Sequence, residues 1–280
     1  MKRYLRSRLV LLRAKLWFLF YYESRPDVRA LQKLLRRRKP EARACFIFST
    51  KNRVDFTKAS LDSMNLSGGF DVIWLDASSE ITALNLFKNY RPQNFNIIAR
   101  IPNIKHGPDV AIQLGLTLLY HSNYEFIGLI ENDVKFSKDW LPTLLGLFEV
   151  DPSEMGVKKV GAASLRNYRV RNLAIKENFS YAWNLGAGMI LFRRKVVKKV
   201  LRNYGFMPAQ SLRRFFKKRF KIDVSAVRDP LFPAAFDKGS LLPGDAKFCL
   251  NVWRQGYACV ASVPSLARNM DTSGDEDLYL

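Results

Sequence analysis

The chain has few of the residues that build disulfide frameworks and metal clusters. Only three cysteines occur in 280 residues, and the two histidines are His106 and His121. The cysteines, Cys45, Cys249 and Cys259, lie in apolar stretches and form no Cys-x-x-Cys pair. This usage excludes a disulfide framework and a zinc site built on paired cysteines. It predicts reduced core cysteines in a protein of the cytosol.

The chain also lacks a long apolar run near its start. The longest one there, residues 16–22, is far shorter than the ~20 residues that a membrane-spanning helix needs. No small-residue cleavage site follows it, so we expect no removable signal peptide. Hydrophobic residues nevertheless make up 48% of the sequence and aromatic residues 13%, which excludes wholesale disorder and allows one sizeable core.

Acidic residues are scarce relative to basic ones. The 46 Lys and Arg residues face 25 Asp and Glu residues, and the net charge of +21 indicates an anionic partner: a membrane surface, nucleic acid or a phosphorylated substrate. Residues 1–43 alone hold 14 basic residues against three acidic ones, which is about half of the excess. We therefore expect a basic amphipathic N-terminal segment (1–43), one domain (44–270) and an acidic tail (271–280).

Two segments combine basic and aromatic residues. In residues 1–22, leucines recur at spacings of three and four beside Lys, Arg, Trp, Phe and Tyr, a pattern typical of an amphipathic helix. In "SLRRFFKKRFKI", residues 211–222, six of the nine residues at 213–221 are basic. Each segment fits a helix lying on an anionic membrane or a helix packed against protein. Nucleic acid would attract the same charges, but no zinc-finger or RNP-like motif supports it.

The middle of the chain alternates between apolar runs and amphipathic stretches. The runs at 44–50, 70–76, 95–101 and 125–131 predict strands, and the stretches at 55–64 and 109–122 predict helices. This alternation predicts an α/β fold with a mostly parallel central sheet and helices on both faces.

Polar residues stand where these strands end. "TKNR" (50–53) follows the first strand, Asp76 ends the second, and "END" (131–133) follows the fourth. Ligands of such sheets bind at the carboxyl ends of the strands. Because no glycine-rich dinucleotide or Walker motif occurs, a nucleotide would be held by side chains and a divalent metal. Glu131 and Asp133 are hard oxygen donors suited to Mn²⁺ or Mg²⁺, with a diphosphate as the other ligand.

Six stretches between residues 44 and 268 follow one another in a familiar order: "FIFSTKNR", "VIWLDASS", "NIKHGPDVAIQLGL", "LIENDVKFSKDWL", "GAGMILFRRKVV" and "PGDAKFCLNVWRQGY". This series resembles the inverting nucleotide-sugar glycosyltransferases of the GT-A fold (glycosyltransferase family 2), which include chitin, cellulose and O-antigen synthases. Ser49 replaces a proline usual in the first motif. The resemblance implies a GT-A fold and transfer of a sugar from a nucleotide-diphosphate donor to a glycan or lipid-linked acceptor.

The resemblance also implies roles for individual residues. Asp133 would bind Mn²⁺ or Mg²⁺, and Asp245 would be the general base that takes the proton of the acceptor hydroxyl. Asp76 would accept the N–H of the nucleobase, and Arg53 would approach the diphosphate. The other residues implied in nucleotide-sugar or acceptor binding are Thr50, Asn52, Gly107, Glu131, Trp183, Asn184, Gly186 and Gly188.

Each assignment has an alternative that needs no ligand. The stretch 131–133 fits a solvated acidic turn, and Arg53 fits an exposed loop residue. Asp76 and Asp245 each fit the N-cap of a helix, where a carboxylate accepts backbone N–H groups. Trp183 fits a core residue on a strand.

Two departures from the family pattern concern the metal and the acceptor. Members often carry a late histidine that helps to hold the metal, whereas this chain has Asn269 near that place, and His106 and His121 come too early. The region 195–242, which would shape the acceptor site, matches no motif of the family.

These observations predict a cytoplasmic glycosyltransferase, peripheral on the inner face of a membrane. Two other classes of function stay open. One is a nucleic-acid-binding protein that keeps the scaffold without activity. The other is a sugar nucleotidyltransferase, which has a similar fold but usually a glycine-rich first turn that is absent from "STKNRVDF".

Overall fold

The computed structural model describes residues 22, 24–104, 108–186, 188–202, 216–218 and 244–271. The strands of its main sheet are β1 (Ala44–Thr50), β2 (Asp71–Asp76), β3 (Asn96–Ile101), β4 (Phe126–Glu131), β6 (Lys159–Ser164), β7 (Asn172–Ile175), β8 (Phe179–Ala182), β9 (Met189–Arg193) and β10 (Tyr257–Ser262). A second, two-stranded sheet pairs β5 (Val134–Phe136) with β11 (Ala267–Asn269).

The helices lie mostly between consecutive strands. They are α2 (Pro26–Arg37), α3 (Val54–Met64), α4 (Ile81–Asn89), α5 (Pro108–Tyr120), α6 (Trp140–Gly146), α7 (Arg194–Arg202) and α10 (Gly244–Arg254). Short 3-10 turns occupy Leu147–Glu149, Ser153–Met155 and Arg169–Arg171. The four strands and two helices predicted in the middle of the chain are confirmed to within two residues.

The sheet is mostly parallel, as predicted. Within the described residues its order is β3-β2-β1-β4-β9-β6-β10-β8-β7. The pairings β1–β2, β2–β3, β1–β4 and β6–β10 are parallel, and only β8 and β9 run against the other strands. From β1 the chain passes to the neighbouring strand β2 and then to β3 at the edge of the sheet. It next crosses to β4, which lies on the other side of β1. A crevice forms at such a switch point, outside the carboxyl ends of β1 and β4.

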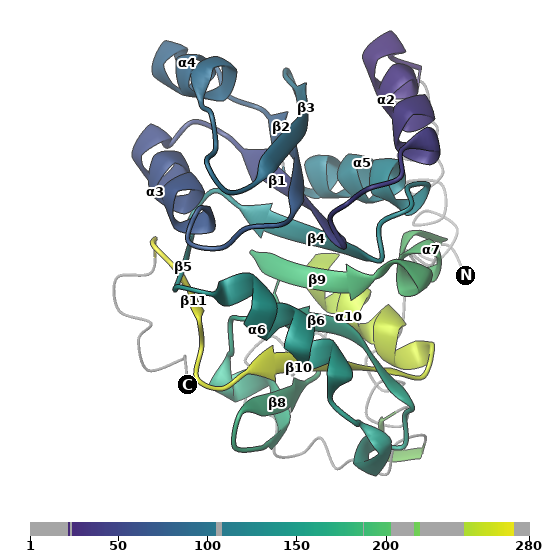
Figure 1. Cartoon of the computed structure of the whole chain (residues 1–280). Coiled ribbons are helices and arrows are strands. Elements are labelled where there is room, and N and C mark those ends of the chain that lie inside the picture. Colours follow the sequence, from purple (N-terminus) through teal and green to yellow (C-terminus); the bar gives the residue numbers. More distant parts are fainter. Residues whose placement is uncertain are drawn as a thin grey trace, which may run out of the picture.

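Helices cover both faces of the sheet (Figure 1). Successive side chains of a strand point to opposite faces. Ile47 of β1 faces α5, since a Cβ on Gly115 would lie 2.4 Å from its Cδ1. Phe46 points the other way and packs edge-to-face on Trp140 of α6, with ring centroids 5.5 Å apart. Gly128 of β4 leaves space for the same ring, because a Cβ there would lie 2.1 Å from its Cδ1.

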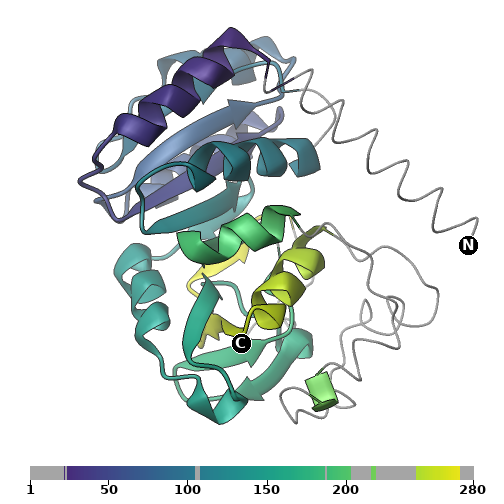
Figure 2. The same cartoon turned by 90° about the vertical axis from the view of Figure 1, so that its right-hand side faces the viewer.

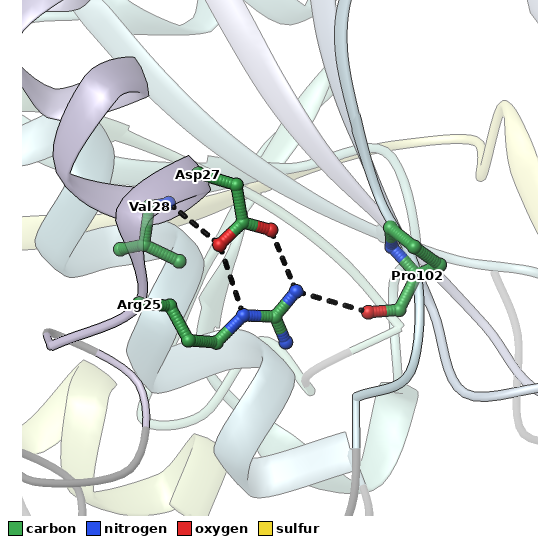
Figure 3. A network of polar contacts seen from close by, with 4 residues as sticks. All are labelled: Arg25, Asp27, Val28 and Pro102. Atoms are coloured by element: carbon green, nitrogen blue, oxygen red, sulfur yellow. Dashed lines mark hydrogen bonds and ion pairs between the residues drawn. The ribbon is translucent and has the colours of Figure 1, made fainter.

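The start of α2 is tied to the carboxyl end of β3. Arg25 donates from Nε and Nη2 to Asp27, at 3.0 and 2.6 Å, and from Nη2 to the carbonyl of Pro102 at 3.4 Å (Figure 3). Asp27 Oδ1 also accepts the N–H of Val28 at 2.9 Å. The hydrogen bond from Arg25 holds the pKa of Asp27 below its ordinary value.

The end of α2 is tied to a buried carboxylate. Asp71, at the amino end of β2, accepts hydrogen bonds from Arg38 and Asn96 at 3.0 and 3.1 Å, and another from the Tyr124 hydroxyl. Three donors offset the desolvation of this charge. Tyr22, the last residue of the first basic-aromatic segment, is fully buried in the core, as the protein-packed alternative predicts. The boundary predicted at residue 43 stays a prediction.

The two basic-aromatic segments lie almost entirely outside the described residues. Of the second one, Phe216 is buried and packs edge-to-face on Trp253, while Lys217 and Lys218 are exposed. These three residues follow the protein-packed alternative. In the part of the chain that is described, no helix is long and apolar enough to cross a bilayer.

Candidate active site

The strand ends that the sequence singled out lie at one edge of the sheet. Thr50 pairs with Asp76 across β1 and β2, and Ser49 pairs with Glu131 across β1 and β4. The three neighbouring strands therefore end level with one another at the switch point. The predicted edge brings Thr50, Asp76 and Glu131 together.

A cavity of about 260 Å³ opens at this edge. Its apolar wall consists of Leu75, Ala77 and Ala111. Its polar lining comes from Ser49, Thr50, Lys51, Arg53, Glu131 and Asn132. An apolar wall with a few convergent polar and charged groups is typical of a small-molecule site.

Asp76 is buried beneath this edge and holds two loops together. It is 1% exposed, and its Oδ1 accepts hydrogen bonds from the hydroxyls of Thr50 at 2.6 Å and Ser78 at 2.7 Å. The Thr50 hydroxyl in turn accepts the indole N–H of Trp74 at 2.8 Å. The N-cap alternative for Asp76 is wrong, because the N-cap of α4 is Glu80. Contact with a nucleobase stays a prediction for Asp76.

Asn52 and Arg53 form a left-handed turn between β1 and α3. Their φ angles are 52° and 51°, a region that costs a non-glycine residue about 1–2 kcal/mol. Hydrogen bonds offset this cost: Asn52 N donates to Ser78 Oγ at 2.7 Å, and Asn52 Oδ1 accepts the N–H groups of Ser79 and Glu80 at 3.0 and 3.3 Å. Asn52 thus fixes the turn from which the Arg53 side chain leaves.

Arg53 faces two carboxylates across the mouth of the site. Its Nη1 lies 2.7 Å from Asp271 Oδ2 and 3.9 Å from Asp133 Oδ2. Asp271 reaches this place because β11 pairs with β5, and Met270 N donates to the carbonyl of Asp133 at 2.8 Å. We predicted that Asp271 belongs to the acidic tail, and we did not predict its contact with Arg53. Its only signal was its position two residues after Asn269, where the family often carries a metal-binding histidine.

Asp133 fits a divalent ion that a diphosphate helps to hold. Within the described residues its Oδ1 is buried and has no hydrogen-bond partner, an arrangement that is costly without a cation. The same residues contain no group of three His, Cys, Asp or Glu side chains able to enclose a metal. Mg²⁺ and Mn²⁺ sites in phosphate chemistry commonly use one or two carboxylates and complete the shell with phosphate oxygens. The donor set therefore fits this mode of binding rather than a protein-only cage.

The guanidinium of Arg166 lies near Glu131. Glu131 N donates to the carbonyl of Gly188 at 2.9 Å. A Cβ on Gly188 would lie 2.0 Å from Arg166 Nη1 and 3.5 Å from Glu131 Oε2. Only a glycine at 188 therefore lets the buried guanidinium of Arg166 reach this position, and Arg166 is 4% exposed. Arg166 belongs to none of the sequence motifs, so its place beside Glu131 was not predicted.

Arg166 belongs to a cluster around Tyr168. The guanidinium carbons of Arg166 and Arg171 lie 5.0 and 4.2 Å from the centre of its ring, within the range of cation–π attraction. Gly186, at φ +76°, leaves room for Tyr168 and Arg171. Trp183 is 1% exposed, so its ring belongs to the core, as the alternative predicted.

Two predicted residues are only partly covered by the structure. Gly107 lies outside the described residues. Asp245 lies at the amino end of α10, and its side chain is outside the described part. Position 245 is one turn before Cys249 on the same helix face, and Leu185 N donates to Cys249 Sγ at 3.3 Å. That face of α10 therefore packs near the loop that ends at Gly188.

Several solved structures share part of this fold. They include a mannosyltransferase from Pyrobaculum calidifontis in complex with GDP-Man and Mn²⁺ (TM-score 0.43, 15% identity, 71% of this chain and 58% of that one). TarS of S. aureus gives a TM-score of 0.45 at 15% identity over 79% of this chain and 34% of that one. A UTP-bound UGPase from Acinetobacter baumannii gives 0.47 at 7% identity over 82% and 89%. At these identities the likeness concerns the fold alone. No protein-family model and no curated protein matches the chain.

Proposed function

We propose that this protein is an inverting glycosyltransferase that moves a sugar from a nucleoside-diphosphate donor to a glycan or lipid-linked acceptor. The observation that carries the proposal is the cavity at the switch point, bounded by the ends of β1, β2 and β4 and flanked by Arg53 and Asp133. Such an edge binds ligands in open α/β sheets, and its side chains suit a diphosphate.

The donor diphosphate would lie against the cationic side of the cavity. Lys51 and Arg53 line it, and a guanidinium binds two phosphate oxygens at once. Asp133 would hold Mn²⁺ or Mg²⁺ through its buried Oδ1, with Glu131 nearer the ribose. When bound, the metal supplies Lewis-acid neutralisation of the leaving diphosphate. Arg53 adds positive charge at the same place, which stabilises the leaving group further.

The acceptor side of the reaction needs a base. We assign this role to Asp245, which would take the proton of the acceptor hydroxyl while that oxygen attacks the anomeric carbon. The bond to the diphosphate breaks on the opposite face, so the configuration inverts. The loop before Gly188 contacts α10 through Cys249 and the backbone of Glu131 through Gly188, and this connection supports the assignment.

A panel of nucleotide sugars tests the donor site. Thermal unfolding would be measured with each donor and Mn²⁺, for the wild type, for Asp133→Ala and for the exposed control Asp62→Ala. Saturation at about 100 times Kd stabilises by about 2.7 kcal/mol, which is roughly 5 °C or more for a chain of this size. A wild type that responds to no donor contradicts the proposal. An equal response of Asp133→Ala contradicts the metal assignment alone.

A sugar nucleotidyltransferase is the second candidate, because the cavity would suit a nucleoside triphosphate as well. The two reactions differ in their products. Release of pyrophosphate from a nucleoside triphosphate and a sugar phosphate would identify a nucleotidyltransferase. Release of a nucleoside diphosphate from a nucleotide sugar would identify the proposed transfer.

We also propose that the enzyme binds the inner face of a membrane as a peripheral protein. The support is the basic and aromatic composition of residues 1–22 and 211–222. Flotation with anionic liposomes tests these segments. Unchanged binding after deletion of 1–22 and neutralisation of the basic residues at 213–221 would contradict their role.

A further inference from the structure

The outer surfaces of α2 and α7 carry exposed lysine and arginine side chains. On α2, Lys33, Arg36 and Arg37 are exposed, while the opposite side of the helix buries its apolar residues. On α7, five of nine residues are Lys or Arg, and Lys195 and Lys198 are exposed. None of these five exposed cations forms an ion pair within the described part of the chain.

The two helices present these cations on one side of the molecule. Both pack against α5, which lies between them (Figure 2). Lys198 Nζ lies 5.9 Å from the centre of the Tyr120 ring at the end of α5. Arg36 of α2 and Lys198 of α7 both lower the pKa of His121, after the larger effect of its partial desolvation. Both cations act on His121, which shows that the charges of α2 and α7 lie close together at the end of α5.

We infer that this basic face, defined by Lys33, Arg36, Arg37, Lys195 and Lys198, binds the anionic headgroups of a lipid bilayer. Membrane contact would thus extend from the two basic-aromatic segments to a folded surface, independently of every step of the proposed reaction. Clustered like charges without counter-ions cost stability. Anionic headgroups would supply the missing counter-ions.

A bilayer fits this face better than nucleic acid does. Leu34, which is 51% exposed, lies beside Arg37 on the surface of α2, so an apolar side chain accompanies the cations. In the sequence, the basic-aromatic residues 1–22 precede α2 and residues 211–222 come after α7. Cations beside exposed apolar and aromatic residues are typical of proteins that lie on anionic membranes.

Charge removal on the full-length chain tests the inference. The test variant replaces the five cations of the basic face with glutamine. The matched control removes five exposed lysines elsewhere, by Lys→Gln at Lys58, Lys88, Lys138, Lys158 and Lys159. Both variants lower the net charge equally. Binding would be measured by flotation with vesicles of phosphatidylcholine and phosphatidylserine, and with phosphatidylcholine alone.

We expect the test variant to bind anionic vesicles at least ~10-fold more weakly than the wild type, since each nearby cation strengthens binding about fivefold. We expect the control to change less than about threefold, and neutral vesicles to bind neither variant nor wild type. Equal losses in the two variants would overturn the inference. So would strong binding to neutral vesicles, or a preference for RNA over vesicles in competition.

Two further measurements keep the result interpretable. Thermal unfolding checks that the test variant is folded, and the double variant Arg36→Gln/Lys198→Gln replaces it if it is not. The donor-binding panel is repeated on the same proteins. A test variant that still binds donor but no longer floats supports the basic face. If the wild type floats, the test variant does not, and neither binds any donor, the proposed function is contradicted while the basic face stays supported.

Discussion

Arg53 Nη1 lies 2.7 Å from Asp271 Oδ2, so a residue of the first strand–helix turn is joined to one that follows the last strand. The same nitrogen lies 3.9 Å from Asp133 Oδ2. The guanidinium therefore occupies the space between two carboxylates where a divalent ion would also be attracted. Two arginines thus lie beside residues 131–133: Arg53 near Asp133 and Arg166 near Glu131.

Arg53→Ala should raise the affinity of the nucleotide-free protein for Mn²⁺. The substitution removes a positive charge about 4 Å from Asp133 that repels the metal ion. Because Arg53 is half exposed and solvent weakens this repulsion, we expect the Kd for Mn²⁺ to fall only roughly three- to tenfold. Donor affinity should fall in the same variant, because the diphosphate loses its arginine. Titration of Mn²⁺ followed by electron paramagnetic resonance measures the first effect. An unchanged or weaker Mn²⁺ affinity would show that Asp133 does not bind the ion.

Gly188→Ala should reduce glycosyl transfer at least ~10-fold and cost about 1–3 kcal/mol of stability. The new methyl would overlap Arg166 Nη1, and overpacking a buried site displaces side chains. Gly146→Ala is the matched control, since a Cβ there meets nothing within 4 Å. Initial rates and urea unfolding would be measured together. Full activity of Gly188→Ala would rule out a role for the position of Arg166.

Thr50→Val should destabilise the protein by about 2–4 kcal/mol. It removes a hydroxyl that donates to Asp76 and accepts from Trp74, and so leaves buried polar groups unpaired. Thr50→Ser keeps the hydroxyl and should cost only about 1 kcal/mol for the lost methyl. Urea unfolding separates the two variants. Equal losses would indicate that packing of the methyl, not the hydrogen bonds, holds the two loops.

Lys198→Gln should raise the pKa of His121, although partial desolvation and Arg36 keep it below that of a free histidine. The pKa is depressed in the folded state, so the unfolded chain takes up the proton first. Stability from this group is therefore present above the ordinary histidine pKa and decreases as the pH falls through it. Binding to anionic vesicles should also raise this pKa. NMR titration of the imidazole measures both, with Lys88→Gln as a remote control that should leave it unchanged.

Sequence patterns predicted the central half of the fold well because they are local. An apolar run of six or seven residues that ends in polar residues identifies a strand and its end without any long-range information. This is why β1 to β4, α3 and α5 matched, and why Thr50, Asp76 and Glu131 were expected at one edge. Because these strands are parallel, their carboxyl ends lie at the same edge of the sheet.

Residues brought together from distant parts of the chain escaped prediction. Asp271 reaches Arg53 only because β11 pairs with β5, and a three-residue strand has almost no sequence signal. Arg166 reaches the side of Glu131 only because Gly188 leaves room for it. The burial of Trp183 was left open because a strand-end tryptophan suits a core and a sugar pocket alike.

The α/β alternation, the positive charge and the polar strand ends follow from the amino-acid sequence alone, since each depends on residues that are neighbours in the chain. Which charges lie close together depends on the folded chain: Arg53 lies between Asp133 and Asp271, and the basic face combines two helices that are far apart in the sequence. Such meetings depend on strand pairing and helix packing, whose partners are separated by many residues and leave no local pattern.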